Sequence, residues 1–167
     1  EVHVYDRRSG IGGTLNEARN APYGDDELWT CVEFQQAMCA KTGVQFHLGT
    51  AVTEQLIQDE LPDTVVLATG PVYPKLKAKG GDHRKVVDLL GVMSGQTPVG
   101  GNVVVYGNRK PGIGCALLLA GQGKKVTLVG REKSAGFDVN PSFKWRYLIY
   151  MRQAGINAYN DCDIEEV

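Results

Sequence analysis

The chain has 167 residues, of which 43% are hydrophobic and 22% are charged, and its formal net charge is −1. This is the composition of an ordinary soluble protein, long enough for one core or two small ones. Lys and Arg are scattered along the sequence, so neither nucleic acid nor a membrane surface is an expected partner. No apolar run approaches the ~18 residues of a membrane span and no secretion leader precedes Glu1, so we expect a cytoplasmic location.

The first 70 residues predict strands that alternate with helices. In chain order we expect a strand at 2–6, a turn and a long loop through residue 22, a helix from the acidic stretch 25–27 to about 41, a strand at 44–48, a helix at 53–61 and a strand at 64–70. The strand at 64–70 is apolar throughout, which indicates burial on both faces.

The rest of the sequence repeats this alternation after a connection. Residues 71–101 contain prolines and glycines, with one short helix expected near 86–93. We then expect a strand at 102–106, a helix at 111–122, a strand at 125–129, a helix at 141–154 and a strand at 157–159. Alternating strands and helices predict parallel sheets joined by right-handed crossovers, which is an α/β fold.

An internal repeat organises the chain. Residues 1–10 and 125–134, which lie 124 positions apart, both read as a buried strand that leads into a turn. Residues 102–115, ahead of the second copy, contain a strand, a glycine turn and a helix start, which together open a dinucleotide-binding unit. If the repeat holds, the matching turn of the first unit would lie roughly 12 to 17 residues before Glu1. We therefore expect two adjacent Rossmann-like units, at 1–97 and 98–167, the first lacking its opening strand and glycine turn.

The sequence offers no metal site and no catalytic group. The four cysteines have no C-x-x-C spacing, so a zinc or redox site is not expected. None of the three histidines is matched by a Ser or Cys at a spacing that indicates a triad. We assign no catalytic residue and no metal ligand.

The first unit has candidate nucleotide contacts where its strands end. An acidic residue after the second strand of a dinucleotide fold accepts hydrogen bonds from the ribose hydroxyls, and Asp6 stands at that place. Taken alone, such an aspartate is usually a turn residue. The nearby Gly12 and Gly13 strengthen the assignment, because glycines let the backbone approach a bound group closely. The apolar strand at 64–70 ends in Ala68, Thr69 and Gly70.

In their order and spacing, the segments 6–7, 12–15 and 65–70 resemble the FAD half of the glutathione-reductase-like flavoproteins, which bind two dinucleotides. The short interval after Gly70, together with Asn140, Pro141 and the helix that contains Trp145, looks most like the C-terminal region of the trimethylamine dehydrogenase and 2,4-dienoyl-CoA reductase group. The resemblance covers nearly all of the chain. It implies a larger flavin-dependent oxidoreductase in which this region binds FAD or ADP, while a barrel absent from this sequence holds FMN and a 4Fe-4S cluster.

The resemblance also implies roles for individual residues. Asp6 would hold the adenosine ribose with Arg7 beside it, and Val52 would meet adenine through its backbone. The pyrophosphate side would be lined by Gly13 and Leu15, and the segment Thr69–Gly70 would approach the nucleotide. Because the missing glycine turn would bind the pyrophosphate itself, we expect this chain alone to bind FAD weakly or not at all.

The second glycine turn departs from the G-x-G-x-x-G pattern at its centre. Counting from Gly107, the pattern needs glycines at 109 and 112; Gly112 is present, but position 109 is Arg. The middle glycine lets a phosphate touch the backbone, so Arg109 either blocks the site or replaces it with a side-chain contact. Pro111 removes one N–H donor at the same place.

The ribose-reading position of the second unit has no acid. Gly130 stands there and Arg131 follows, so a bound dinucleotide would be NADP, with Arg131 and Lys133 meeting its 2′-phosphate. Two interpretations stay open: a Rossmann unit kept only for packing, or a working NADP site.

Each interpretation implies a different parent enzyme, in which this segment itself is inactive and the remainder of the chain is its partner. A unit kept for packing suits an amine dehydrogenase or demethylase that passes electrons to an external acceptor such as an electron-transfer flavoprotein. A working site suits an NADPH-dependent 2,4-dienoyl-CoA or enoate reductase. A third hypothesis is a non-catalytic ADP-binding structural module.

Overall fold

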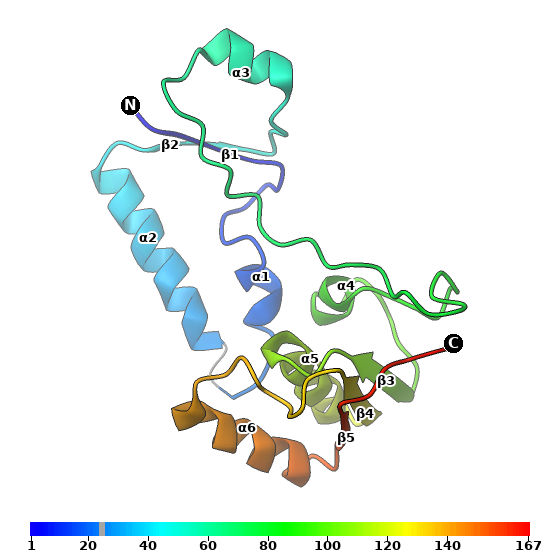
Figure 1. Ribbon diagram of the computed structural model, residues 1–167. Helices are drawn as coiled ribbons and strands as arrows, with labels where there is room; N and C mark the ends of the chain where they lie inside the picture. Colours follow the sequence, from blue (N-terminus) through cyan, green and yellow to red (C-terminus); the bar gives the residue numbers. More distant parts are fainter. Residues whose placement is uncertain (24–25) are drawn as a thin grey trace. The chain divides into compact units, whose positions relative to one another are not determined.

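The computed structural model describes residues 1–23 and 26–167, in two compact units (Figure 1). Unit 1 consists of Glu1–Asn16 and Glu27–Tyr73, and unit 2 of Glu17–Asp26 and Pro74–Val167. Each unit contains helices and a parallel sheet, so the predicted α/β fold with Rossmann-like units is confirmed. The packing divides the chain differently from the ranges 1–97 and 98–167, whose assignment as nucleotide-binding domains stays a prediction.

Unit 1 is built on two parallel strands, β1 (His3–Asp6) and β2 (Gln45–Leu48). Its helices are α2 (Trp29–Lys41) and α3 (Glu54–Glu60). The short helix α1 (Leu15–Ala18), which lies in the expected loop, begins in unit 1 and ends in unit 2. A 3-10 turn at Asp26–Leu28 precedes α2, and Asp25 of the expected acidic start lies outside the described residues. The hydroxyl of Thr53 accepts a hydrogen bond from the backbone N–H of Leu56 at 3.2 Å, which caps α3.

The strand predicted at 64–70 is wrong. These residues form neither a strand nor a helix, and the side chains of Val66 and Leu67 are 82% and 83% exposed. A parallel strand exists only with a ladder partner, and the one partner of β1 is β2 among the described residues. An apolar segment without a neighbouring strand stays unpaired and in contact with water.

Unit 2 follows the sequence expectation closely. Its strands β3 (Asn102–Tyr106), β4 (Lys125–Gly130) and β5 (Asn157–Asn160) form one parallel sheet in the order β3-β4-β5. Its helices are α4 (Leu89–Met93), α5 (Lys110–Gly121) and α6 (Pro141–Gln153). Every element predicted beyond residue 101 is confirmed, each within one residue of its expected bounds.

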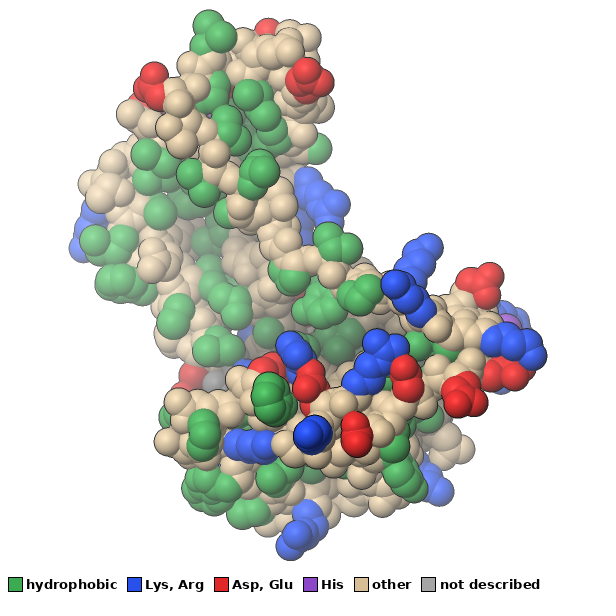
Figure 2. Space-filling view, viewed as in Figure 1, with side chains coloured by type: hydrophobic (Ala, Val, Ile, Leu, Met, Phe, Trp, Pro, Cys, Tyr) green, Lys and Arg blue, Asp and Glu red, His purple; other side chains and the backbone are tan. Residues whose placement is uncertain are grey.

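The core of the protein lies in unit 2. Helix α5 is apolar on all sides, and Ile113, Leu117 and Leu119 are at most 2% exposed, as is Leu128 of β4. Burying each such side chain contributes about 1.5–3 kcal/mol. Val32 is the one buried hydrophobic residue among those described in unit 1. On the face drawn in Figure 2, hydrophobic side chains lie on the surface over unit 1.

The register of the strands confirms the internal repeat. In unit 1, His3 pairs with Gln45 and Asp6 with Leu48; in unit 2, Thr127 pairs with Asn157 and Gly130 with Asn160. Residues 3 and 6 therefore occupy the same ladder positions as residues 127 and 130, which lie 124 positions later. The strand β4 also pairs with β3 on its other side, whereas β1 has no second neighbour among the described strands.

Candidate nucleotide-binding sites

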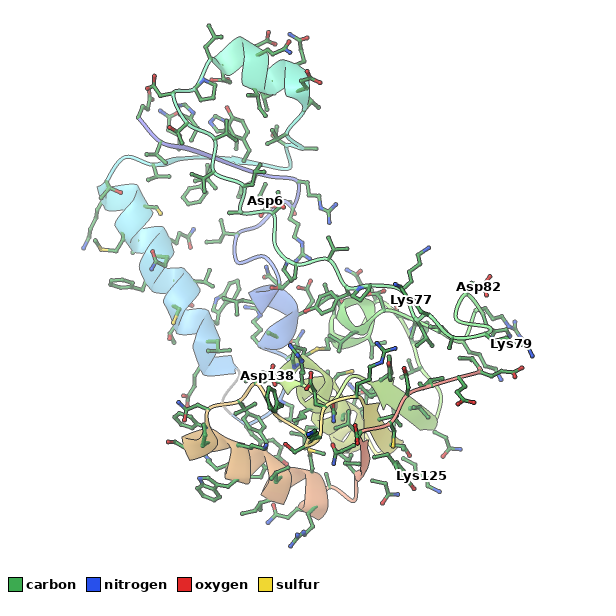
Figure 3. All side chains as sticks on the ribbon, viewed as in Figure 1. Asp6, Lys77, Lys79, Asp82, Lys125 and Asp138 are labelled. Atoms are coloured by element: carbon green, nitrogen blue, oxygen red, sulfur yellow. The ribbon has the colours of Figure 1, made fainter. Side chains whose placement is uncertain are left out.

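The glycine turn of unit 1 is joined to the end of β1 by Arg8. Asp6 is half-buried at the carboxyl end of β1, where Figure 3 labels it, and its Oδ1 accepts a hydrogen bond from the N–H of Arg8 at 2.8 Å. The guanidinium of Arg8 donates to the carbonyl of Gly13 at 2.8 Å. The structure thus brings together Asp6 and Gly13, while Arg7 is exposed beside them. Sequence reasoning missed Arg8, whose only signal is its place two residues after the strand.

The turn itself has one tightly determined conformation. Gly12 and Gly13 have φ angles of 99° and 51°, and a Cβ on Gly12 would lie 2.7 Å from the ring of Trp29 at the start of α2. Glycine is therefore required at position 12 both for its backbone angle and for space. The amide of Asn16 donates to the carbonyls of Ile11 and Gly13 at 2.9 and 3.0 Å, which holds the turn against α1.

A cavity of about 290 Å³ opens beside this turn. It is lined mainly by apolar atoms, from Gly12 and Leu15 on one side and from Val32 of α2 and Phe46 of β2 on the other. The expected pyrophosphate contact Leu15 therefore faces an apolar space.

The remaining candidates of unit 1 lie outside the turn. Val52 follows β2 and is 50% exposed. Ala68, Thr69 and Gly70 belong to the exposed segment that follows α3, and Gly70 has a φ of 81°. The ladder of β1 runs along β2, so the structure does not place this segment in the sheet.

In unit 2, the first and last glycines of the turn, Gly107 and Gly112, allow the close packing of helix and turn that the motif predicts. Gly107 follows β3 with a φ of 118°. A Cβ on Gly112 would lie 1.7 Å from the carbonyl oxygen of Gly107, so only glycine allows α5 to start this close to the turn.

The side chain of Asn108 fills the space that a side chain at position 130, the expected ribose-reading position, would occupy. It is 1% exposed, and its Nδ2 donates to the carbonyl of Glu132 at 2.9 Å and to Oδ1 of Asn160 at 2.8 Å. Its Oδ1 accepts from the N–H of Glu132 at 3.3 Å and lies 2.1 Å from where a Cβ of Gly130 would be. Position 130 must therefore be glycine, because any larger side chain would collide with Asn108. Sequence reasoning missed this pair, although a polar residue inside the glycine turn was a visible signal.

Both arginines expected to meet phosphate are ion-paired within the chain. Arg109 contacts Oε1 of Glu132 through Nε at 2.8 Å and Nη2 at 2.5 Å, and this pairing raises the pKa of the guanidinium. Arg131 contacts Oδ2 of Asp163 through Nε at 2.8 Å and Nη2 at 2.6 Å. Hydrogen bonds from the Tyr106 hydroxyl and from Arg131 lower the pKa of Asp163 to about 2.

The start of α5 is occupied by a carboxylate from the same unit. The N–H of Lys110 donates to Oδ1 and Oδ2 of Asp138 at 3.0 and 3.3 Å, and Figure 3 labels Asp138 in the segment between β4 and α6. The N–H of Gly136 donates to the carbonyl of Asn108 at 2.8 Å. The segment after β4 therefore lies against the glycine turn, which no local sequence signal predicted.

Other kinds of site can be assessed for residues 1–23 and 26–167. These residues contain no group of three or more His, Cys, Asp or Glu that could hold a metal ion. No helix in them is both long and apolar enough to cross a membrane. All four cysteines are free, and burial raises the pKa of the Cys115 thiol to about 11.

The chain is similar to oxidoreductases along its whole length. It is 27% identical over 171 residues to the NADH oxidase of Thermoanaerobacter brockii, covering 100% of this chain and 26% of that protein. It is 31% identical over 144 residues to the N,N-dimethylglycine/sarcosine dehydrogenase of Chromohalobacter salexigens, covering 81% of this chain and 21% of the dehydrogenase. No family model matches the sequence.

The solved structure of a complex of 2-naphthoyl-CoA reductase with 2-naphthoyl-CoA superposes with a TM-score of 0.90 at 27% identity, over 99% of this chain and 25% of the reductase chain. The chain thus spans about a quarter of the length of these proteins.

Proposed function

We propose that the chain is the nucleotide-binding portion of a larger flavin-dependent oxidoreductase. Unit 1 would bind the ADP half of FAD, or ADP itself, and the parent enzyme would resemble an amine dehydrogenase or demethylase that passes electrons to an external acceptor. FMN and a 4Fe-4S cluster would belong to the remainder of the parent protein. The similarity to a dehydrogenase, an oxidase and a reductase over about a quarter of their lengths supports a part of such an enzyme.

The observation that carries the assignment of unit 1 is the position of Asp6. Its carboxylate stands at the carboxyl end of β1, next to a glycine turn, at the ladder position that Gly130 occupies in unit 2. Ligands of parallel α/β sheets bind at the carboxyl ends of the strands, and an acid at this place accepts the ribose hydroxyls. Of the two units, only unit 1 has an acid there.

The residues of unit 2 do not fit a dinucleotide. Arg109 and Arg131 already bind Glu132 and Asp163, and Asn108 fills the space at Gly130. A 2′-phosphate on Arg131 would have to displace Asp163, whose Oδ2 contacts two nitrogens of the guanidinium, and would approach that carboxylate. These contacts favour an enzyme that does not take electrons from NADPH through unit 2.

Substitution of Asp6 tests the nucleotide site. In the complete protein, Asp6→Ala should weaken ADP binding by about 10-fold to 100-fold, because one charge-assisted hydrogen bond contributes about 1.5–3 kcal/mol. Isothermal titration with ADP measures this, and the flavin released on heating identifies the cofactor. Asp63→Ala, an exposed aspartate of unit 1, is the matched control and should leave ADP affinity unchanged. Equal ADP affinity in both variants would remove Asp6 from the site.

A second measurement separates the rival enzymes. The complete protein should not oxidise NADPH under anaerobic conditions when an artificial acceptor is supplied. Steady turnover of NADPH would instead support a 2,4-dienoyl-CoA or enoate reductase. A complete protein that retains ADP, contains no flavin and shows no redox activity would point to the structural module.

A further inference from the structure

We propose that Asp138 is an internal replacement for a nucleotide phosphate: its carboxylate occupies the anion-binding start of α5 and keeps dinucleotides out of unit 2. This inference goes beyond the proposed function, since it concerns how unit 2 closes its own site. It stands whether unit 1 binds FAD or ADP.

The hydrogen-bond donors at the start of α5 are already in use or missing. The helix begins at Lys110, whose backbone N–H donates to both carboxylate oxygens of Asp138, at 3.0 and 3.3 Å. The second position is Pro111, which has no N–H. Phosphates bind helix starts through such N–H groups and the positive end of the helix dipole. The first two positions of the helix therefore offer no N–H to a phosphate, and the carboxylate already supplies the favourable negative charge.

Buried residues anchor the segment that carries Asp138, whose own side chain is exposed. Ala135 and Val139, on either side of Asp138, are 2% and 8% exposed. The N–H of Gly136 donates to the carbonyl of Asn108, and the ammonium of Lys144 donates to the hydroxyl of Ser134 at 2.7 Å. Asp138 is thus held at the helix start by contacts on both sides of it in the sequence.

The charges around the glycine turn also disfavour an anion. The one arginine in the glycine turn, Arg109, is paired with Glu132, so the turn is faced by two carboxylates, those of Glu132 and Asp138. An incoming pyrophosphate would compete with these two carboxylates for the Arg109 guanidinium and the Lys110 N–H. Removal of Asp138 takes away one of these charges and frees the Lys110 N–H at the same time.

Inorganic pyrophosphate is the probe for a direct test in the complete protein. In Asp138→Ala, we expect pyrophosphate to shift the amide resonance of Lys110 in a saturable way, and to bind at least about tenfold more tightly than in the wild-type protein. Without pyrophosphate the variant should melt about 2–4 °C lower, because a helix-end anion is lost, and pyrophosphate should restore the melting temperature.

The controls separate this site from the rest of the protein. Asp82→Ala removes an exposed aspartate of the same unit and should behave as the wild type. Pyrophosphate that binds to unit 1 would affect the Asp82 and Asp138 variants equally, so a difference between them reports on the start of α5. Asp138→Asn keeps an acceptor for the Lys110 N–H and provides a variant that removes only the charge. Saturable pyrophosphate shifts at Lys110 in the wild-type protein, or no such shift in either Asp138 variant, would overturn the proposal.

Discussion

The buried side chain of Asn108 allows a quantitative prediction for unit 2. Asn108→Ala removes two donated hydrogen bonds, to the Glu132 carbonyl and the Asn160 side chain, and one accepted from the Glu132 N–H. Each net bond contributes about 0.5–1.5 kcal/mol, so the loss should be about 2–4 kcal/mol in the free energy of unfolding. At about 2–4 °C per kcal/mol for a chain of this length, the melting temperature should fall by roughly 5–15 °C.

Tryptophan fluorescence can report this loss for unit 2 separately. Trp145 lies in α6 of unit 2 and Trp29 in α2 of unit 1, so urea unfolding in a Trp29→Phe background follows unit 2 alone. The matched control is Asn157→Ala, an exposed asparagine of β5, which should change stability by less than about 0.5 kcal/mol.

A double variant tests the bond between the two asparagines. Asn108→Ala combined with Asn160→Ala should lose less than the sum of the two single losses, by about 1 kcal/mol. Our account of the turn would be refuted if Asn108→Ala were no more destabilising than Asn157→Ala.

Three further predictions follow from exposure and charge. Cys115, whose pKa burial raises to about 11, should resist iodoacetamide at pH 8 while exposed Cys31 reacts, and unfolding should make both react; equal rates in the folded protein would contradict its burial. Because the pKa of Asp163 is lowered to about 2, its ionised form stabilises the folded state above pH ~4, and this contribution is lost as pH falls through about 2; an NMR titration with a midpoint near 4 would disprove the pairing. Replacement of Val66 and Leu67 by Thr should change stability by less than about 0.5 kcal/mol, as urea unfolding can check, because both are exposed; a larger loss would show that they pack in solution.

The sequence predicted unit 2 well because its local signals and its packing agree. Helix α5 is apolar on every side and is buried, and the β-branched strands on either side of it, β3 and β4, pair as their pattern indicates. The same kind of pattern failed at 64–70, where the apolar residues have no neighbouring strand to pair with. A β-strand depends on its partner, so its sequence alone predicts a tendency and not a structure.

The candidate sites likewise contain features that the sequence predicted and contacts that only the structure revealed. The order of residues alone was enough to predict three features: the end of β1 at Asp6, the replacement of the middle glycine of the motif by Arg109, and the internal repeat at an interval of 124 positions. What the sequence could not reveal is which charged groups meet: Arg109 with Glu132, 23 positions away, and Arg131 with Asp163, 32 positions away.

The pairing of Lys110 with Asp138, 28 positions away, is of the same kind. Such contacts arise because parallel strands bring their carboxyl ends, and the loops that follow them, to one edge of the sheet. The sequence by itself therefore determined that unit 2 has a Rossmann-like fold, and only the tertiary structure decided which of its own side chains meet at the carboxyl ends of its strands.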